Sequence, residues 1–260
     1  MKYFCVIGDP IHHSKSPRIH NNAIKSLGLD GIYTRYHLQD KEKLRQIFYE
    51  LGLSGANITL PFKEQALKIA DIQDPMALKI GAANTLVLKN SKLHAYNTDA
   101  PGFLKAIEEF KCLKKALILG SGGTAKALAH ALRGEGIEVQ IANRSGAKFA
   151  EFKDFPCALY EDLREFQFDL VVNSTAAGLS GDDLPCSQDL LAEILRHKPC
   201  AFEVIYGKET PFLKLCKTHQ IFCKDGLDML LWQGIFAFEL FFNVRDRREL
   251  LKKAMQEALK

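Results

Sequence analysis

Short apolar runs alternate with amphipathic stretches in the first part of the chain. Residues 41–51 have apolar side chains at the spacing of one helical face, and Asp40 is placed to cap that helix. Pro61 is expected to open a second helix, because the first turn of a helix does not need the N–H that proline lacks. The other apolar runs read as strands, of which the last two form a hairpin at Asn90-Ser91. The predicted strands are 3–7, 31–38, 55–60, 85–88 and 92–96.

The second part of the chain predicts a parallel sheet. A helix over 102–110 leads into the apolar strand 117–119. Further apolar runs of strand length follow at 139–143, 170–175 and 201–206, with helical stretches between some of them. This alternation is typical of a doubly wound α/β fold.

The chain is predicted to end in helices. One begins at Thr210-Pro211, and a strongly apolar one spans 227–242, where it should be buried. Asp246, with Glu249 three residues later, has the pattern of a capping box and is expected to start the last helix.

Composition and charge narrow the class of protein. The 260 residues are 47% hydrophobic and 25% charged, which is ordinary for a globular protein. The net charge of +4 comes from scattered basic residues, so we expect no binding to nucleic acid or to a membrane surface. Seven cysteines form no Cys-x-x-Cys pair, and no signal peptide or spanning segment is seen, which favours reduced thiols in the cytoplasm. We expect no metal site, because the histidines lack the spacing of metal ligands.

A glycine turn over residues 119–123 joins an apolar strand to a helix. Gly120 permits the tight turn, and Gly122 removes a side chain where phosphates must approach the backbone. Ala125 keeps the helix close to the strand, and the helix N-terminus offers free N–H groups to an anion. The turn therefore predicts a site for a dinucleotide pyrophosphate, and a turn that serves packing only is the alternative.

The following strand ends at Asn143-Arg144, about twenty residues after the glycines, where a dinucleotide-binding domain reads the ribose of its cofactor. NAD enzymes usually carry Asp or Glu at this point. Here no carboxylate would repel a 2′-phosphate, Arg144 can pair with one through its planar fork, and Lys148 adds charge. We therefore favour NADP, with a solvated basic loop as the alternative.

Two pairs of polar residues in the first part of the chain suit a binding site. Ser14 and Ser16 precede a proline-started helix, so their hydroxyls and the helix N-terminus could bind a carboxylate, although helix capping is the alternative. Asn57 and Thr59 project from the same face of one predicted strand. The histidines near the serine pair, at 12, 13 and 20, are expected to be surface or capping residues.

Lys63 and Asp99 form the candidate catalytic pair. Lys63 lies in the first turn of a predicted helix, where a positive charge opposes the helix dipole and is a poor structural choice. Asn84 and Asp99 flank the predicted hairpin and are expected at its base. A carboxylate close to the lysine would hold the ammonium for proton exchange with a hydroxyl or carbonyl group. The alternatives are a plain surface lysine and a capping aspartate.

The order of these motifs resembles the shikimate dehydrogenase family over nearly the whole chain. The motifs are Ser-x-Ser-Pro at 14–17, Gly-Ala-Asn-x-Thr-x-Pro-x-Lys at 55–63, Gly-Ala-x-Asn-Thr at 81–85, Asn-Thr-Asp at 97–99, Gly-x-Gly-Gly at 120–123, Asn-Arg at 143–144 and Asp-Gly-x-x-Met-Leu-x-x-Gln at 225–233. The resemblance implies reversible, NADPH-dependent reduction of 3-dehydroshikimate to shikimate, within chorismate and aromatic amino-acid biosynthesis. It also implies a monomer or a homodimer.

The resemblance further implies an α/β fold of two domains. An N-terminal α/β substrate-binding and catalytic domain would span 1–99, and a Rossmann-like, doubly wound NADP domain would span 100–225. The C-terminal helices, 226–260, would pack back onto the first domain.

Motif by motif, the resemblance implies roles for individual residues. Ser14 and Ser16 would hold the substrate carboxylate, while Lys63 and Asp99 would be the catalytic pair, without a decision on which of them moves the proton. The residues that would bind the ring hydroxyls or line the site are Asn57, Thr59, Asn84, Asp99, Tyr206 and Gln233. The residues that would bind the cofactor are Gly120, Ser121, Gly122, Gly123, Thr124, Ala125, Asn143, Arg144, Lys148, Thr175 and Gly226.

Three other functions remain as alternatives. A quinate/shikimate dehydrogenase that uses NAD would share most of the polar residues, but an acidic residue near Asn143 would be expected. A methylene-tetrahydrofolate dehydrogenase has a similar architecture, but the Ser14/Ser16 pair speaks against it. A non-catalytic metabolite sensor on the same scaffold would be expected to lose Lys63 or Asp99, and both are present.

Overall fold

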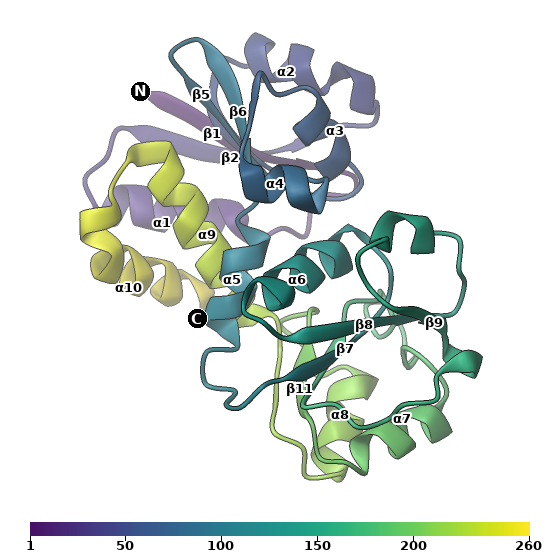
Figure 1. Ribbon diagram of the computed structural model, residues 1–260. Helices are drawn as coiled ribbons and strands as arrows, with labels where there is room; N and C mark the ends of the chain where they lie inside the picture. The colour runs from purple at the N-terminus through teal and green to yellow at the C-terminus, as the bar shows by residue number, and fades with distance from the viewer. The chain divides into compact units, whose positions relative to one another are not determined.

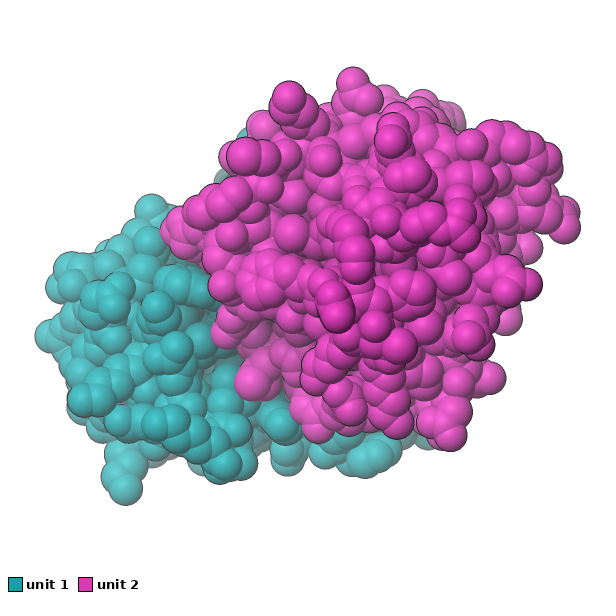
Figure 2. Space-filling model, turned by 90° about the horizontal axis from the view of Figure 1, so that it is seen from below, with its two compact units in different colours: residues 1–102, 231–260 teal, residues 103–230 magenta.

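The computed structural model describes residues 1–260, which form two compact units. Unit 1 comprises residues 1–102 and 231–260, and unit 2 comprises residues 103–230 (Figure 2). The chain leaves unit 1 within α5 (Asp99–Ala106) and returns within α9 (Leu227–Phe242). The C-terminal helices therefore belong to the same unit as the N-terminal sheet.

Unit 1 is built on a mixed sheet with the strand order β2-β1-β3-β5-β6-β4 (Figure 1). Its strands are β1 (Lys2–Gly8), β2 (Gly31–His37), β3 (Leu53–Ile58), β4 (Ile72–Gln73), β5 (Thr85–Lys89) and β6 (Lys92–Tyr96). β1 pairs in parallel with β2 and β3, whereas β5 is antiparallel to β3 and to β6. The predicted hairpin is confirmed: Asn90 and Ser91 both have positive φ, which matches the twist of a tight hairpin turn.

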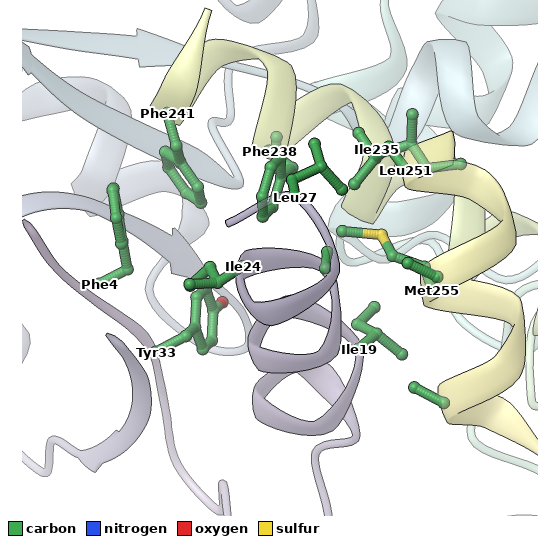
Figure 3. Close-up of a cluster of buried hydrophobic side chains, with 14 of the residues drawn as sticks. Phe4, Ile19, Ile24, Leu27, Tyr33, Ile235, Phe238, Phe241, Leu251 and Met255 are labelled. Carbon is green, nitrogen blue, oxygen red and sulfur yellow. The ribbon is translucent and has the colours of Figure 1, made fainter. Parts of the chain in front are cut away.

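Both faces of this sheet are buried, which explains the continuous apolar runs of its strands. Phe4 and Val6 of β1 point into one core, and Cys5 and Ile7 point into the other. The first core is covered by α1 (Ser16–Ser26), α9 and α10 (Arg248–Leu259). The second is covered by α2 (Leu44–Glu50), α3 (Lys63–Lys68) and α4 (Pro75–Ile80). Figure 3 shows the first core, where side chains of α1, α9 and α10 meet.

Several helix starts differ from the sequence predictions. α3 begins at Lys63 with Phe62 as its N-cap, so Pro61 lies in the turn before the helix rather than opening it. α10 begins at Arg248 without a side-chain cap, and Asp246 lies in a preceding 3-10 turn. By contrast, the Asp40 and Thr210 caps are confirmed, since both side chains accept backbone N–H groups.

The helix expected at 102–110 begins earlier, at Asp99. The Asn97 side chain is the reason, because its Oδ1 accepts the backbone N–H groups of Asp99 at 3.1 Å and Ala100 at 3.2 Å. Pro101 then lies in the first turn, where its missing N–H costs nothing.

Unit 2 has a fully parallel sheet with the strand order β12-β11-β10-β7-β8-β9. Its strands are β7 (Lys115–Leu119), β8 (Glu138–Asn143), β9 (Cys157–Leu159), β10 (Leu170–Asn173), β11 (Cys200–Glu203) and β12 (Cys223–Lys224). Figure 1 shows α6 (Gly123–Gly134) on one face of the sheet and α7 (Gln188–Leu195) and α8 (Pro211–Thr218) on the other. The strand order reverses between β7 and β10, and the carboxyl ends at such a switch point are where α/β proteins bind ligands. The predicted two-unit α/β fold is confirmed.

None of the helices combines the length and the apolar character that a membrane span requires. α9 comes from the most apolar stretch of the chain, and its side chains are accounted for by packing within unit 1.

Candidate functional site

Lys63 and Asp99 meet in unit 1, as their positions beside the hairpin predicted. Each is the first residue of a helix, Lys63 of α3 and Asp99 of α5. Lys63 Nζ donates to Asp99 Oδ2 at 2.7 Å, and the side chains are 13% and 10% exposed. The other carboxylate oxygen, Oδ1, accepts from Asn84 Nδ2 at 2.9 Å. The carboxylate is thus held from two sides, and it orients an ammonium that is nearly out of water.

Asn84 is fixed by the backbone around it. Its Oδ1 accepts the N–H of Thr98 at 2.7 Å, and its Nδ2 donates to Thr98 Oγ1 at 3.0 Å as well as to Asp99. Only one orientation of the amide satisfies these bonds, so the NH₂ group is directed at the carboxylate. Thr98 and Thr85, which extends the network, are functional residues that the sequence analysis did not single out, although each stands inside a quoted motif.

A second arm of the network runs through Tyr33 on β2. The Tyr33 hydroxyl donates to Asn57 Oδ1 at 2.7 Å, and it is also hydrogen-bonded to the side chain of Ser16. Asn57 Nδ2 donates to Thr85 Oγ1 at 3.1 Å, which joins this arm to the Asn84 cluster. Burial raises the pKa of the Tyr33 phenol far above its usual range, so the group acts as a neutral bridge. Figure 3 shows its oxygen among apolar side chains, and no polar pattern on its strand pointed to it.

His20 was expected at the surface or as a cap, and that prediction is wrong. It is 1% exposed, and its ring stacks on Tyr33 with centroids 4.2 Å apart. Neither ring nitrogen has a hydrogen-bond partner. Burial lowers the pKa of the imidazole to about 3, so the ring is neutral at ordinary pH.

The other predicted substrate residues are Ser14, Thr59, Gln233 and Tyr206. Ser14 Oγ accepts the N–H of Ser16 at 3.3 Å, but the N-cap of α1 is Lys15 and its side chain makes no capping bond, so neither serine is the N-cap. Thr59 follows the end of β3, and Gln233 lies on α9, closely packed against Gly102 of α5. Tyr206 belongs to unit 2, where burial raises its pKa.

Unit 2 has a cavity of about 880 Å³ at the carboxyl ends of its central strands. The residues that line it include Gly120, Ser121, Gly122, Asn143, Arg144, Lys148 and Thr175, all of them predicted, together with Tyr160, Ser174, Ala176, Ala177 and Cys186. Gly120 has a φ of +109°, and a Cβ there would lie 2.8 Å from Ser174 Oγ. A Cβ on Gly122 would meet nothing within 4 Å, so the turn leaves open space before the N-terminus of α6.

The end of β8 supplies the positive charge of this cavity. Asn143 Nδ2 donates to the backbone oxygen of Ser145 at 2.9 Å, which shapes the loop after the strand. Arg144 and Lys148 are exposed there and make no ion pair with a carboxylate of the chain. The buried Tyr160 hydroxyl has no hydrogen-bond partner in the chain, and it lies near the Arg144 charge. Such an orphaned polar atom suits a cavity that takes a polar ligand.

Four predicted cofactor residues do not line the cavity: Gly123, Thr124, Ala125 and Gly226. Ala125 is completely buried, so its part is to keep α6 against the sheet. Gly226 lies directly against the backbone that follows β11, where a Cβ would come within 2.1 Å of the Val204 oxygen. Close backbone packing within unit 2 therefore explains why residue 226 is a glycine.

Nothing in the sequence pointed to Tyr160 as a residue of the cavity, and only the structure places it there.

Comparison with known proteins identifies the family of the chain. Residues 6–86 match the family model described as the shikimate dehydrogenase substrate binding domain. The chain is 45% identical to the shikimate dehydrogenase (NADP(+)) of Helicobacter hepaticus, covering 92% of this chain and 90% of that protein. It superimposes with a TM-score of 0.86 on shikimate 5-dehydrogenase from Thermus thermophilus in complex with NADP(H) and shikimate, at 34% identity and covering 99% and 100% of the two chains.

A third relative concerns the choice of cofactor. Shikimate 5-dehydrogenase from Listeria monocytogenes, in complex with shikimate and NAD, is 28% identical with a TM-score of 0.82 and covers 97% of this chain and 96% of that one. These matches extend over nearly the whole length of each protein. The chain belongs to the shikimate dehydrogenase family.

Proposed function

We propose that this protein is an NADP-dependent shikimate dehydrogenase, which reduces 3-dehydroshikimate to shikimate reversibly in chorismate and aromatic amino-acid biosynthesis. The observation that carries the proposal is the Lys63–Asp99 pair, nearly buried and held at 2.7 Å with Asn84 fixing the carboxylate from behind. Withdrawing a lysine from water costs free energy, and this pair holds the ammonium in the fixed position that proton exchange with a substrate requires. This observation argues against the non-catalytic sensor.

The lining of the cavity in unit 2 fits NADP in its chemistry. The glycine turn and the N-terminus of α6 would hold the pyrophosphate, and the open space at Gly122 lets phosphate reach the backbone N–H groups. Arg144 and Lys148 would bind the 2′-phosphate, with Asn143 beside them. When bound, NADPH supplies the hydride for the carbonyl carbon of the substrate.

Lys63 is the residue that we assign as proton donor. Asp99 is the less suitable donor, because both its oxygens accept hydrogen bonds in the ionised form. The Lys63 ammonium has protons beyond the one given to Asp99, and it stabilises the negative charge that develops on the substrate oxygen before it transfers a proton. Asp99 keeps the ammonium in place, and Asn84 keeps Asp99 in place.

We assign recognition of the substrate to the polar residues that the motifs predict for it. Ser14 and Ser16 would bind the carboxylate at the start of α1, where the helix dipole favours an anion. The ring hydroxyls would be bound by Asn57, Thr59, Asn84, Asp99 and Gln233, and Tyr206 would line the site. Buried polar groups that a wrong substrate leaves unpaired are costly, which gives the site its selectivity for a hydroxyl pattern.

The proposal is tested by following shikimate oxidation through the absorbance of the reduced nicotinamide, with NADP⁺ and NAD⁺ in parallel and quinate as a second substrate. Rapid oxidation of shikimate with NADP⁺ and poor oxidation of quinate support it. Comparable rates with quinate or with NAD⁺ would place the protein among the quinate/shikimate dehydrogenases instead. Binding of NADP⁺ without turnover of either substrate would favour the sensor.

Tyr33→Phe is expected to weaken substrate binding without slowing the chemical step. The ring and its stack on His20 are kept, but Asn57 loses its donor and Ser16 its partner. Asn57 and Ser16 are both assigned to substrate binding, so loss of the bond that positions them should raise the KM for shikimate about tenfold, the size expected for one hydrogen bond, with kcat nearly unchanged. Steady-state kinetics measure this, and Tyr36→Phe on the same strand is the matched control, because Tyr36 packs against the other core. A tenfold loss of kcat at unchanged KM would contradict the assignment.

Arg144→Ala is expected to raise the KM for NADP⁺ while leaving the KM for NAD⁺ nearly unchanged. The guanidinium has no carboxylate partner in the chain, so its removal costs the folded protein little. A hydrogen bond to a charged group contributes about 1.5–3 kcal/mol, which corresponds to a rise of roughly tenfold or more. Lys148→Ala should act in the same direction with a smaller effect. Equal changes for both cofactors would show that Arg144 does not read the 2′-phosphate.

We include a cytoplasmic location and a monomeric or homodimeric assembly in the proposal. All seven cysteines are free in the structure, which suits a reducing compartment. Sedimentation would distinguish the two assemblies.

A further inference from the structure

Glu203, the last residue of β11, is a fully buried carboxylate that the reaction does not use. Its partners are hydrogen-bond donors from three directions. Oε2 accepts from Asn173 Nδ2 at 2.8 Å and from the Thr210 hydroxyl at 2.9 Å, and Oε1 accepts the N–H of Ile205 at 3.0 Å. A carboxylate placed among donors in this way accepts every bond that they offer.

The consequence for Asn173 is that its amide has one possible orientation. Its NH₂ group is directed at Glu203, so its Oδ1 faces the next residues of the chain. There Oδ1 accepts from the backbone N–H of Thr175 at 3.0 Å and from the Thr175 hydroxyl at 2.8 Å. Thr175 Oγ1 in turn accepts the N–H of Ala177 at 3.1 Å. A buried chain of bonds therefore runs from Glu203 to the loop after β10.

That loop forms one wall of the cavity in unit 2. Thr175, Ala176 and Ala177 line the cavity, and the bonds from Asn173 hold this segment at its start. Ser174 donates to the Leu119 carbonyl oxygen through its N–H at 2.9 Å and through its hydroxyl at 2.8 Å, which ties the loop to the glycine turn. The shape of the wall therefore depends on the orientation of the Asn173 amide.

We propose that Glu203 is a positioning residue for the cofactor site: it sets the amide orientation of Asn173, and through Asn173 it holds the loop 174–177 in the shape that receives NADP. The part concerning NADP rests on the proposed function. The role of Glu203 is specific to a carboxylate, because only an acceptor at both oxygens is compatible with this set of donors.

Glu203→Gln tests the donor pattern with almost no change of shape. The NH₂ group of the introduced glutamine must face either Asn173 Nδ2 or the N–H of Ile205, so two donors oppose each other. Rotation of the Asn173 amide relieves the first conflict only by directing NH₂ at the N–H of Thr175. The backbone N–H of Ile205 cannot turn away, whereas the Asn173 side chain can rotate. We therefore expect the glutamine NH₂ group to face Asn173 and the loop to lose its anchor.

The double variant Glu203→Gln/Asn173→Asp restores the bonds to residue 173 and to Ile205, with the amide and the carboxylate in exchanged places, and only the Thr210 hydroxyl loses its acceptor. The introduced glutamine would donate its NH₂ group to the introduced aspartate, which still accepts from Thr175, while Ile205 keeps its acceptor. The net charge of the cluster is unchanged. A residue needed only for bulk or for charge would not be rescued in this specific way.

The measurement is amide hydrogen exchange at Thr175 and Ala177 in the cofactor-free protein at pH 8, together with the dissociation constant for NADP⁺. Burial raises the pKa of Glu203 to about 7, so the group is ionised under these conditions. Glu203→Gln should raise the hydrogen-exchange rates of both amides and the dissociation constant for NADP⁺ about tenfold. The double variant should restore the rates and the constant to within about threefold of wild type. Should Glu203→Gln fail to fold, recovery of the exchange rates and of NADP⁺ binding in the double variant still decides the question.

Glu239→Gln is the matched control, since Glu239 is a buried glutamate of unit 1 that pairs with Arg248. It should leave exchange at Thr175 and Ala177 at the wild-type rate. Unchanged hydrogen-exchange rates in a folded Glu203→Gln protein, or no recovery of those rates in the double variant, would overturn the proposal. Amide hydrogen exchange is measured without cofactor. A wild-type protein that fails to bind NADP⁺ would therefore overturn the proposed function, whereas the role of Glu203 in holding the loop would still be tested by the exchange rates of Thr175 and Ala177.

Discussion

Lys63→Ala is expected to lower kcat by about 10³-fold or more, because it removes both the proton donor and the charge that stabilises the developing oxyanion. The KM for shikimate should change much less, since the residues assigned to the carboxylate and to the hydroxyls are untouched. Shikimate oxidation with NADP⁺ at saturation measures the effect. Turnover within tenfold of wild type would refute the catalytic role of Lys63.

The alanine variant also leaves a buried carboxylate without its counter-ion, so loss of activity could come from loss of structure. Asp99 would keep only the bond from Asn84, and removal of one partner from a buried ion pair costs about 3–5 kcal/mol. Lys63→Arg separates the two effects. A guanidinium keeps the charge and the pair, but it does not release its proton at the pH of the assay. We expect a folded protein that binds shikimate and has lost most of its turnover.

The core of the candidate site could be predicted because its residues stand at the ends of regular elements. The hairpin flanked by Asn84 and Asp99 has a clear alternating pattern, and Lys63 follows a strand that pairs with it. Once those strands pair, the three side chains must come together. The glycine turn was predictable for the same reason, since the order strand, turn and helix fixes the position of Gly120 and Gly122 at the edge of the sheet.

The supporting residues could not be predicted, because their roles arise only from contacts between distant segments. Tyr33 on β2 is an aromatic residue in a strand, which by itself indicates core, and its bond to Asn57 depends on the register of three strands. Glu203 reads as a charge at a strand end, and its burial depends on the packing of Thr210 and Asn173 around it. Two helix starts were also predicted wrongly. Asp246 and Pro61 have helix-start patterns, yet each lies in a turn, and the helix begins two residues later.

His20 is expected to contribute a loss of stability in acid. In the folded state burial lowers the pKa of its imidazole to about 3, whereas in the unfolded chain the pKa has its ordinary value of 6.5. Below pH 6.5 the unfolded chain therefore binds a proton that the folded state excludes. The contribution to stability is fully present above pH 6.5 and is lost as the pH falls toward 3, by about 2 kcal/mol at pH 5.

His20→Leu is expected to remove this loss at little cost, because neither ring nitrogen has a hydrogen bond to lose. Urea unfolding at pH 8 and pH 5 measures the effect. Between these pH values, the free energy of unfolding of the variant should rise by about 2 kcal/mol relative to that of wild type. His12→Leu, which changes an exposed histidine, is the control and should follow the wild-type curve. Parallel curves for wild type and His20→Leu would contradict the assignment.

The comparison between variants is needed because Glu203 acts in the opposite direction. Burial raises its pKa from 4.5 to about 7, so its contribution to stability is fully present below pH 4.5 and is lost as the pH rises through 7. Between pH 4.5 and 6.5 the folded state holds one proton on Glu203, and the unfolded state holds one on His20, so the two slopes cancel in the wild type. In His20→Leu only the effect of Glu203 remains, so the free energy of unfolding should fall by about 1.4 kcal/mol for each unit that the pH rises across that interval. A flat curve for His20→Leu would show that Glu203 is not protonated in the folded protein at these pH values.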